Sequence, residues 1–360
     1  MKCTNNHPER SFYTEREWAR IQMKEAEEKK KLRKLGLILA ALLLVCGILL
    51  FSVYYFVFRP HDYDLYQPYQ NTDPVYGFQS SLQSGTKAVP FSDGLCVSDG
   101  TEYSTAITLN SYSAGLFDVN HEEVLYAKDI FAKRSPASIT KIMTALVTLK
   151  YGNLDEMVTV TSTVKNIEEG SSVCDIKEGD VLSLKQLLYG MMVASGNDAS
   201  MMIAEHIGGS VSNFVDLMNE EAMSIGATST HFSNPHGLTD PEHYTTVYDI
   251  YLIFQEALKY DIFQDIINRK NYYAEYKHQD GSDVAVTWES TNHYFTNEAD
   301  IPENVSIFGG KTGTTEDAGA CLALMTKDLY GNPFISVILH AGDKNSLYEE
   351  MNELLSLIEN

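Results

Sequence analysis

The chain has 360 residues and a formal net charge of −22, and 44% of its residues are hydrophobic. This composition provides enough apolar material for one large folded domain or two small ones, so it excludes wholesale disorder. The strong negative charge argues against nucleic acid as a partner.

The first 34 residues differ in charge from the rest. They contain ten basic and six acidic residues, whereas the remainder carries a net charge of −26. Residues 15–34 are expected to form a charged helix, since Glu25 and Lys29 lie four residues apart, as do Glu27 and Lys31. A solvated stalk is the expected role of this cytoplasmic segment, with a docking surface as the alternative.

Residues 35–58 contain no charged side chain. As a helix they would span about 36 Å, which crosses a bilayer core of about 30 Å. Basic residues crowd the N-terminal side of this stretch, and only Arg59 lies close beyond it. The sequence therefore predicts a single-pass cell-membrane helix with a cytoplasmic N-terminus. A cleaved signal peptide is disfavoured because the stretch is too long and no small-residue cleavage site follows it.

Residues 59–100 are rich in proline, tyrosine, glutamine and serine and lack sustained apolar periodicity. They are predicted to form an extracytoplasmic linker. Three of the five cysteines fall beyond the membrane span: Cys96, Cys174 and Cys321. Their spacing matches neither a disulfide framework nor a metal site, so we predict free thiols.

The folded body is predicted to occupy residues 101–360, beginning with short strands at 106–109, 115–119 and 123–127. A helix follows Pro136. Ser183 and Gln186 form a capping-box pattern that starts a second helix, which runs into Ser195. A third helix follows at once and ends at residues 208–209. Apolar spacing predicts a fourth over 214–225, with Gly226 as its C-terminal cap.

The C-terminal part is predicted to form strands at residues 305–312, 321–326 and 334–340. Their short connections indicate an antiparallel meander. Residues 347–358 have the spacing of an amphipathic helix that packs on this sheet. The predicted class is α+β, an antiparallel sheet flanked by helices and preceded by one transmembrane helix.

Three short motifs carry the chemistry. Ser138 and Lys141 lie three residues apart at a helix start, so both side chains point to one face. A serine hydroxyl needs an adjacent base, and a lysine amine serves as one if desolvation or nearby positive charge keeps it neutral. Ser195-Gly196-Asn197 lies between two helices, and residues 311–314 (Lys-Thr-Gly-Thr) end a predicted strand. Taken singly, these two stretches could be a helix cap and a polar strand end.

Together the three motifs resemble the set found in penicillin-binding proteins and class A β-lactamases. The resemblance covers about residues 101–358, through stretches at 136–145, 170–172, 178–179, 194–199, 234–238, 243–246, 311–315 and 318–319. The sequence is similar to serine-type D-Ala-D-Ala carboxypeptidases, the low-molecular-mass penicillin-binding proteins of peptidase family S11. This resemblance implies an α/β/α layered, transpeptidase-like fold and a bacterial enzyme.

The resemblance also implies roles for the motif residues. Ser138 would attack the carbonyl between two D-alanines of a peptidoglycan stem peptide, and Lys141 would take its proton. Ser195 would relay a proton to the leaving amine, and Asn197 would hold Lys141 and the substrate amide. Lys311 would supply positive charge beside Ser195. Neither a cofactor nor a metal is expected, and β-lactam antibiotics are expected to be covalent inhibitors.

The substrate-binding residues implied by the resemblance are Thr312, Gly313 and Thr314. The threonine hydroxyls with Lys311 are expected to bind the terminal carboxylate, and Lys344 is a weaker candidate. The backbone N–H groups of Ser138 and Thr314 would form an oxyanion hole.

Three other functions would share all or part of this motif set or fold. A peptidoglycan DD-endopeptidase would use the same constellation. A class A β-lactamase needs a loop glutamate between the second and third motifs, but Glu220 and Glu221 fall inside a predicted helix. A non-catalytic cell-wall-binding scaffold would not require the intact motifs.

Two further alternatives rest on local patterns. A metallopeptidase could be proposed from His231, His236, Asp240 and His243, but the sequence has no His-Glu-x-x-His helix, so structural histidines are favoured. A phosphate-binding loop before Lys311 is excluded, since Val305 stands where its first glycine is required.

Overall fold

The computed structural model describes residues 14, 18–20, 23–24, 26–31, 33–34, 36, 94–98 and 107–359. The chain divides into two units, residues 1–85 and 86–360. In the first unit, the described residues from 18 to 36 are helical and nearly all exposed. Within the described ranges, no helix is long and apolar enough to cross a membrane. The predicted span at 35–58 lies outside those ranges apart from Gly36.

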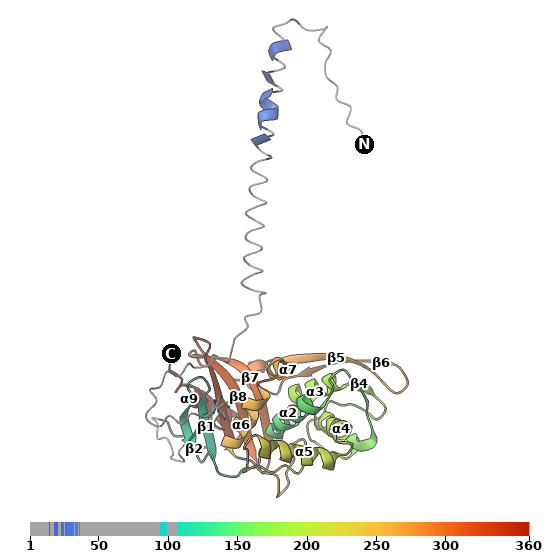
Figure 1. The fold of residues 1–360 in the computed structure, drawn as a ribbon, viewed down its shortest axis with the longest axis vertical. Helices are drawn as coiled ribbons and strands as arrows, with labels where there is room; N and C mark the ends of the chain where they lie inside the picture. The colour runs from blue at the N-terminus through green and yellow to red at the C-terminus, as the bar shows by residue number, and fades with distance from the viewer. Residues whose placement is uncertain are drawn as a thin grey trace, which may run out of the picture. The chain divides into compact units, whose positions relative to one another are not determined.

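The main sheet of the second unit has five antiparallel strands in the order β2-β1-β9-β8-β7 (Figure 1). The N-terminal hairpin and the three C-terminal strands thus share one sheet, because β1 pairs with β9 from Ser113–Leu339 to Asp118–Phe334. The strands are β1 (Ser113–Asp118), β2 (Glu123–Lys128), β7 (Val305–Thr315), β8 (Gly319–Asp328) and β9 (Pro333–Ala341).

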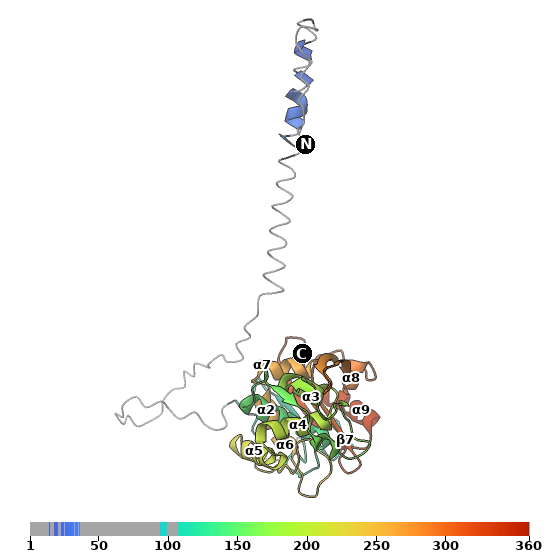
Figure 2. The same cartoon turned by 90° about the vertical axis from the view of Figure 1, so that its right-hand side faces the viewer.

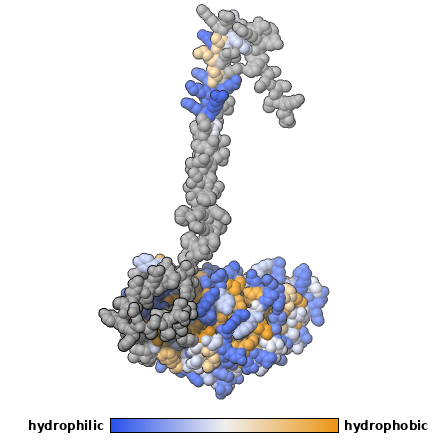
Figure 3. All heavy atoms as spheres, viewed as in Figure 1, coloured by the Kyte–Doolittle hydropathy of each residue, from blue (hydrophilic) through white to orange (hydrophobic). Residues whose placement is uncertain are grey.

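Side chains alternate between the two faces of this sheet and pack on both. On β9, Ile338 joins one buried cluster with the C-terminal helix α9 (Lys344–Leu355), whereas Val337 and Leu339 join a larger cluster with the other helices. Figure 2 shows α9 and α2 on opposite sides of the unit. Hydrophilic residues are interspersed with hydrophobic ones on the face drawn in Figure 3. The apolar core therefore forms two layers, one on each face of the sheet.

Helix α2 lies deep in the larger layer, with eight of its eleven residues buried. It contacts α3, α4, α5 and α6, so its N-terminal residue is held from several sides. The helices of this layer are α2 (Lys141–Tyr151), α3 (Leu184–Val193), α4 (Asn197–Gly208), α5 (Val211–Ser224), α6 (Val247–Ala257) and α7 (Asp261–Ile267); the short helices are α8 (His293–Thr296), η2 (Ala137–Thr140) and η3 (Ser162–Lys165).

A second sheet has the order β3-β4-β5-β6. It consists of β3 (Met157–Thr159), β4 (Val181–Ser183), β5 (Asn271–Lys277) and β6 (Asp283–Glu289). This sheet was not among the predicted elements. The first two strands have only three residues each, which is too short for a periodic pattern to show. The β5–β6 hairpin does have the alternating exposure of a half-buried strand, a signal that was overlooked.

Most predicted elements are confirmed. Both halves of the capping box that starts α3 are present, since Ser183 Oγ accepts from Gln186 N–H and Gln186 Oε1 accepts from Ser183 N–H. The strand predicted at 106–109 is wrong, because the described residues 107–110 lie in no strand. Side chains bind this backbone instead: Lys128 Nζ donates to the Leu109 carbonyl at 2.6 Å.

The three cysteines of the second unit are free and buried, as predicted. Cys96 lies in the segment predicted as a linker, yet residues 94–98 are bonded to the body. The Cys96 N–H donates to the Tyr251 hydroxyl at 2.9 Å, and the Tyr248 hydroxyl donates to the Cys96 carbonyl at 2.8 Å. This segment therefore packs against α6.

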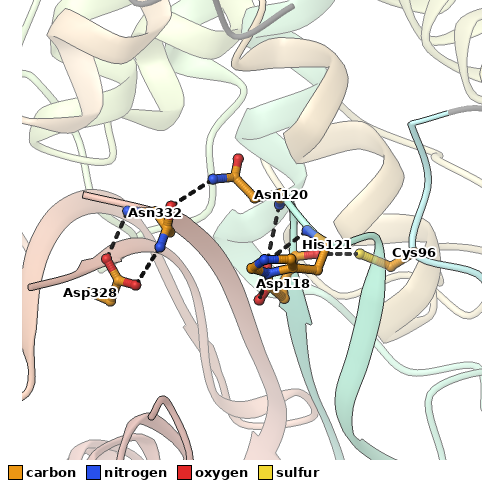
Figure 4. A network of polar contacts seen from close by, with 6 residues as sticks. All are labelled: Cys96, Asp118, Asn120, His121, Asp328 and Asn332. Carbon is orange, nitrogen blue, oxygen red and sulfur yellow. Dashed lines mark hydrogen bonds and ion pairs between the residues drawn. The ribbon is translucent and has the colours of Figure 1, made fainter. Parts of the chain in front are cut away.

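The Cys96 thiol donates to the Asp118 carbonyl at 3.2 Å, next to a polar network that joins two turns (Figure 4). The Asp118 carboxylate accepts the backbone N–H groups of Asn120 and His121 at 3.0 Å. Asn120 Nδ2 donates to Asn332 Oδ1 at 2.8 Å, and Asn332 Nδ2 donates to Asp328. The β1–β2 and β8–β9 turns are thereby held together beside the Cys96 segment.

Candidate active site

The nucleophile candidate Ser138 lies in the short helix η2, directly before α2. Ala137 precedes it with φ +47°, a left-handed conformation that is uncommon for a residue with a side chain. Ser138 is partly exposed, whereas Ala137, Ile139 and Thr140 are buried. The turn therefore presents one hydroxyl outward from an otherwise buried segment.

Lys141 lies one turn further on and is fully buried. Its Nζ lies 2.9 Å from Ser138 Oγ, 2.7 Å from Asn197 Oδ1 and 2.9 Å from the His236 carbonyl oxygen. Burial, and then the positive charge of Lys311, hold the pKa of Lys141 well below its usual range. The two carbonyl oxygens can only accept hydrogen bonds, so they take both N–H groups of a neutral amine. Its lone pair then remains for the Ser138 hydroxyl.

Lys311 is the second buried amine, in the middle of β7. Its Nζ donates to Ser195 Oγ and to the Thr312 carbonyl, both at 3.0 Å. Burial lowers the pKa of Lys311 to about 7. The positive charge of Lys311 lowers the pKa of Lys141 further, so the two buried amines act on each other within one site.

Ser195 and Asn197 flank Gly196 in the tight connection between α3 and α4. Ser195 has φ +60°, and the Asn197 N–H donates to the Ser172 carbonyl at 2.8 Å. The neighbouring Asp198 is buried, and its carboxylate accepts backbone N–H groups from Cys174, Ile176 and Ala199. Burial raises the pKa of Asp198, and these N–H groups oppose that effect. The carboxylate fixes residues 172–176 against the motif, a role that the sequence analysis missed.

The loop from Asn234 to Leu238 supplies another site contact that the sequence analysis missed. The His236 carbonyl accepts from Lys141 Nζ, and Gly237 has φ +90°. A Cβ at Gly237 would lie 1.8 Å from the Ala137 carbonyl oxygen, so only glycine permits this approach. The Asn-Pro-His-Gly turn was recognisable as a motif, but no residue type signals a backbone carbonyl that binds an amine.

Strand β7 passes directly beside residues 136–140, the turn that carries Ser138 (the nucleophile turn). A Cβ at Gly313 would lie 2.9 Å from the Ser138 backbone nitrogen and 3.0 Å from the Pro136 carbonyl oxygen. Glycine is therefore required here for a close approach of two backbones. The contact brings the backbone of Ser138 near that of Thr314, the next residue of β7.

A cavity of about 710 Å³ opens at this contact, lined by Ser138, Asn197 and Thr314 among others. Four carboxylate side chains also line it: Glu168, Glu169, Glu316 and Asp317. The predicted binding residue Thr312 differs from Thr314, because its hydroxyl is hydrogen-bonded to the Thr291 hydroxyl at 2.5 Å. Lys344 begins α9 and is not among the described residues that line the cavity.

The residues on which a metallopeptidase, a β-lactamase or a phosphate-binding loop would depend do not have the surroundings that these functions require. In the described part of the chain, no group of three or more His, Cys, Asp or Glu side chains could hold a metal ion. His243 is buried and bonded to Thr140, and Glu221 is buried inside α5 and pairs with Lys150 at 2.5 Å. Lys311 lies within a strand, so it does not follow a phosphate-binding loop.

Comparison with known proteins agrees with this geometry. The family model for D-alanyl-D-alanine carboxypeptidase matches residues 100–343. The chain is 31% identical over 251 residues to the carboxypeptidase DacF of Bacillus subtilis, covering 69% of this chain and 62% of DacF. It is 33% identical over 252 residues to DacC of Escherichia coli, covering 67% of this chain and 59% of DacC. The chain thus spans about three fifths of the length of these relatives.

Solved structures show the same fold. The crystal structure of the Streptomyces K15 DD-transpeptidase matches with a TM-score of 0.64 and 26% identity, covering 71% of this chain and 98% of that one. The D-alanyl-D-alanine carboxypeptidase DacD from Francisella tularensis matches with a TM-score of 0.61 and 27% identity, covering 75% of each chain. The fold is therefore the mixed α/β fold of the penicillin-binding DD-peptidases. By sequence and by fold, the chain belongs to the D-alanyl-D-alanine carboxypeptidase family.

Proposed function

We propose that this chain is a serine DD-carboxypeptidase that removes the terminal D-alanine from peptidoglycan stem peptides. The observation that carries the proposal is the environment of Lys141. Its buried amine has two carbonyl acceptors and one hydroxyl neighbour, Ser138 Oγ at 2.9 Å. That arrangement suits a neutral amine that accepts the serine proton at neutral pH.

In the first step, Ser138 Oγ bonds to the carbonyl carbon between the two D-alanines while its proton moves to Lys141 Nζ. The carbonyl oxygen becomes an oxyanion, for which the backbone N–H groups of Ser138 and Thr314 are the proposed donors. Losing one such donor typically costs about 10²–10³ in rate. The close approach at Gly313 is what brings these two backbones together.

In the second step, the C–N bond breaks and the leaving amine takes one proton through Ser195, beside Lys311. This is the proton that Lys141 accepted from Ser138, so Lys141 is again a neutral base for the attack of water. The amine departs as D-alanine and leaves an ester on Ser138. Water then attacks this acyl-enzyme, giving the shortened peptide and restoring the Ser138 hydroxyl. Asn197 holds Lys141 throughout, at 2.7 Å from Nζ.

The terminal carboxylate of the substrate needs a cation or hydroxyl donors. We assign it to the charge of Lys311 and the hydroxyl of Thr314, which lines the cavity. The Thr312 hydroxyl is a further donor when it accepts its hydrogen bond from Thr291, because its own O–H is then available to the carboxylate. Since a lysine lacks the bidentate fork of an arginine, carboxylate selectivity is expected to be modest.

The proposal includes a location. The uncharged stretch at residues 35–58 and the basic residues before it support an N-terminal membrane anchor, with residues 101–360 as an extracytoplasmic catalytic domain. Full-length protein is then expected to sediment with membranes after alkaline washing. Recovery as soluble protein cut near residue 58 would contradict the anchor without affecting the catalytic proposal.

The test of the catalytic proposal is a penicillin pulse followed by intact-mass spectrometry on the full chain in detergent. One covalent adduct is expected, absent in Ser138→Ala and retained in the remote control Ser224→Ala. Release of D-alanine from a pentapeptide is expected in parallel, and an absence of both labelling and release would refute the proposal. Cleavage of cross-linked dimers without D-alanine release would assign an endopeptidase instead. An adduct lost within seconds would assign a β-lactamase, with water activated by a carboxylate of the cavity.

A further inference from the structure

The loop between Ser233 and His243 contacts the nucleophile turn at three points. Two of them involve the loop backbone: the His236 carbonyl accepts from Lys141 Nζ, and Gly237 lies close to the Ala137 carbonyl. The third is a side-chain contact, in which His243 Nε2 lies 2.7 Å from Thr140 Oγ1. Both partners of this third contact are buried, with exposures of 3% and 0%.

The hydrogen-bond partners of His243 define its protonation. Its Nδ1 accepts from the Ser233 backbone N–H at 3.0 Å, and an N–H group can only donate. Nδ1 therefore carries no proton. In the neutral ring the single proton is on Nε2, which donates to Thr140 Oγ1. The ring joins the base of the loop, at Ser233, to the turn that carries Ser138.

Thr140 is well placed to transmit this contact. It lies between Ser138 and Lys141 in the sequence, and a Cβ at Gly237 would lie 2.8 Å from its hydroxyl. The hydroxyl is thus held between the imidazole of His243 and the loop backbone. A shift of the imidazole would move both the nucleophile turn and the loop, of which Gly237 and Leu238 line the cavity.

We infer that His243 is a positioning residue for catalysis, which aligns Ser138 with Lys141 through the hydroxyl of Thr140. This inference rests on the proposed acylation of Ser138. An imidazole suits the task because one rigid ring offers an acceptor and a donor on opposite sides. The imidazole of His243 does not line the cavity, so its loss should change the rate constant of acylation and not the affinity for penicillin.

The ring must remain neutral for this role. A protonated Nδ1 would bring two donors together at Ser233, which would break the contact. The titratable groups that act on His243 are Asp240, which favours protonation, and His231, which opposes it; His236 is also coupled to it. Burial outweighs the carboxylate and lowers the pKa of His243 to about 4.

The test is a double-mutant cycle in the full chain, read out as the rate constant of Ser138 acylation at saturating fluorescent penicillin. Thr140→Val removes the hydroxyl at constant volume, and His243→Asn removes the Nε2 donor. Each is expected to slow acylation about 10–100-fold, as small misalignments of reacting groups do. The penicillin concentration for half-saturation is expected to stay unchanged. The double variant is expected to match the slower single variant rather than the product of both losses.

Two controls sharpen the result. His206→Gln alters a partly exposed histidine that pairs with Glu156, and it is expected to acylate at the wild-type rate. Thr140→Ser keeps the hydroxyl and is expected to restore the rate that Thr140→Val loses. If His243→Asn does not fold, the inference is tested with Thr140→Val and Thr140→Ser alone: slow acylation in the first and a wild-type rate in the second would support it, and equal rates in both would overturn it.

Multiplicative losses in the double variant, or folded variants with lower thermal stability but wild-type acylation rates, would overturn the inference. A purely structural histidine would give that second pattern. Wild-type protein that penicillin does not label would overturn the proposed function itself, so the two failures are distinguishable.

Discussion

The approach of β7 to the nucleophile turn can be tested by adding one methyl group, with Gly313→Ala. The new Cβ would lie 2.9 Å from the Ser138 nitrogen, 3.0 Å from the Pro136 carbonyl oxygen and 3.1 Å from Ala137 Cβ. Ordinary contacts begin at 3.4 Å, so strand and turn must separate by about 0.5 Å. The nearest atoms belong to backbone, which cannot rotate away as a long side chain would.

This displacement acts on the two proposed oxyanion donors, because one belongs to Ser138 and the other to Thr314. Losing one donor costs about 10²–10³ in rate, and a partial displacement costs less. We expect Ser138 acylation by penicillin to slow about 10²-fold. Overpacking should also cost about 1–3 kcal/mol of stability, which lowers the melting temperature by about 2–4 °C for each kcal/mol in a body of this size.

The assay is stopped-flow acylation by a fluorescent penicillin, with the melting temperature measured on the same samples. Gly342→Ala is the matched control, since its Cβ would meet only Ser346 Oγ at 3.7 Å and the glycine has no positive φ. It is expected to acylate at the wild-type rate. If Gly313→Ala acylates within twofold of wild type, the proposed oxyanion geometry is refuted.

Three further predictions concern charge. Asn197→Asp would place a carboxylate 2.7 Å from Lys141 Nζ and raise the pKa of that amine. The pH dependence of the acylation rate should therefore move up by about 1–3 pH units. A profile that does not move would contradict Lys141 as the base. The four cavity carboxylates should repel anionic penicillins. Added salt shortens the screening length from about 30 to about 8 Å, so acylation at low penicillin concentration should become faster, and the increase should be smaller in Glu168→Gln. A rate that falls with salt would show that the lysines dominate the electrostatic potential of the cavity. Burial lowers the pKa of His243 in the folded chain to about 4, so between pH 6.5 and 4 the unfolded chain binds more protons at this residue. The free energy of unfolding, measured with urea, should therefore fall by up to about 3 kcal/mol as the pH falls through that window. The decrease should be smaller in His243→Asn.

The sequence predicted an element or a site correctly where characteristic residue types recur at a characteristic spacing. The apolar periods of β8, β9 and α9 predicted their elements, and the Ser183–Gln186 capping box predicted the start of α3 to the residue. The five motif residues (Ser138, Lys141, Ser195, Asn197 and Lys311) were predicted as one site, and the structure brings them together through hydrogen bonds between the motifs. Chemistry-bearing side chains at characteristic spacings are what a sequence displays directly.

Other features depend on backbone conformation and tertiary contact, which composition does not display. The left-handed conformations of Ala137 and Ser195 break local preference, since both residue types favour negative φ. Such conformations persist only where surrounding contacts determine them, and they concentrate at functional sites. The His236 carbonyl is a backbone group, so its residue type gave no signal. The Asp198 carboxylate accepts backbone N–H groups of Cys174 and Ile176, which are distant in the sequence, so only the tertiary structure shows its role. The strand predicted at 106–109 failed because side chains bound its backbone.

The surroundings of Lys141 show how a chain with a net charge of −22 can lower the pKa of a buried lysine. Its hydrogen-bond partners are all uncharged: an amide oxygen, a hydroxyl and the His236 carbonyl. Asp198, a buried carboxylate whose charge acts on Lys141, accepts hydrogen bonds from backbone N–H groups instead. An ion pair would have stabilised the protonated amine and removed the base. The contacts of this amine thus include no carboxylate among the described residues, and burial together with Lys311 lowers its pKa in the direction that the proposed chemistry needs.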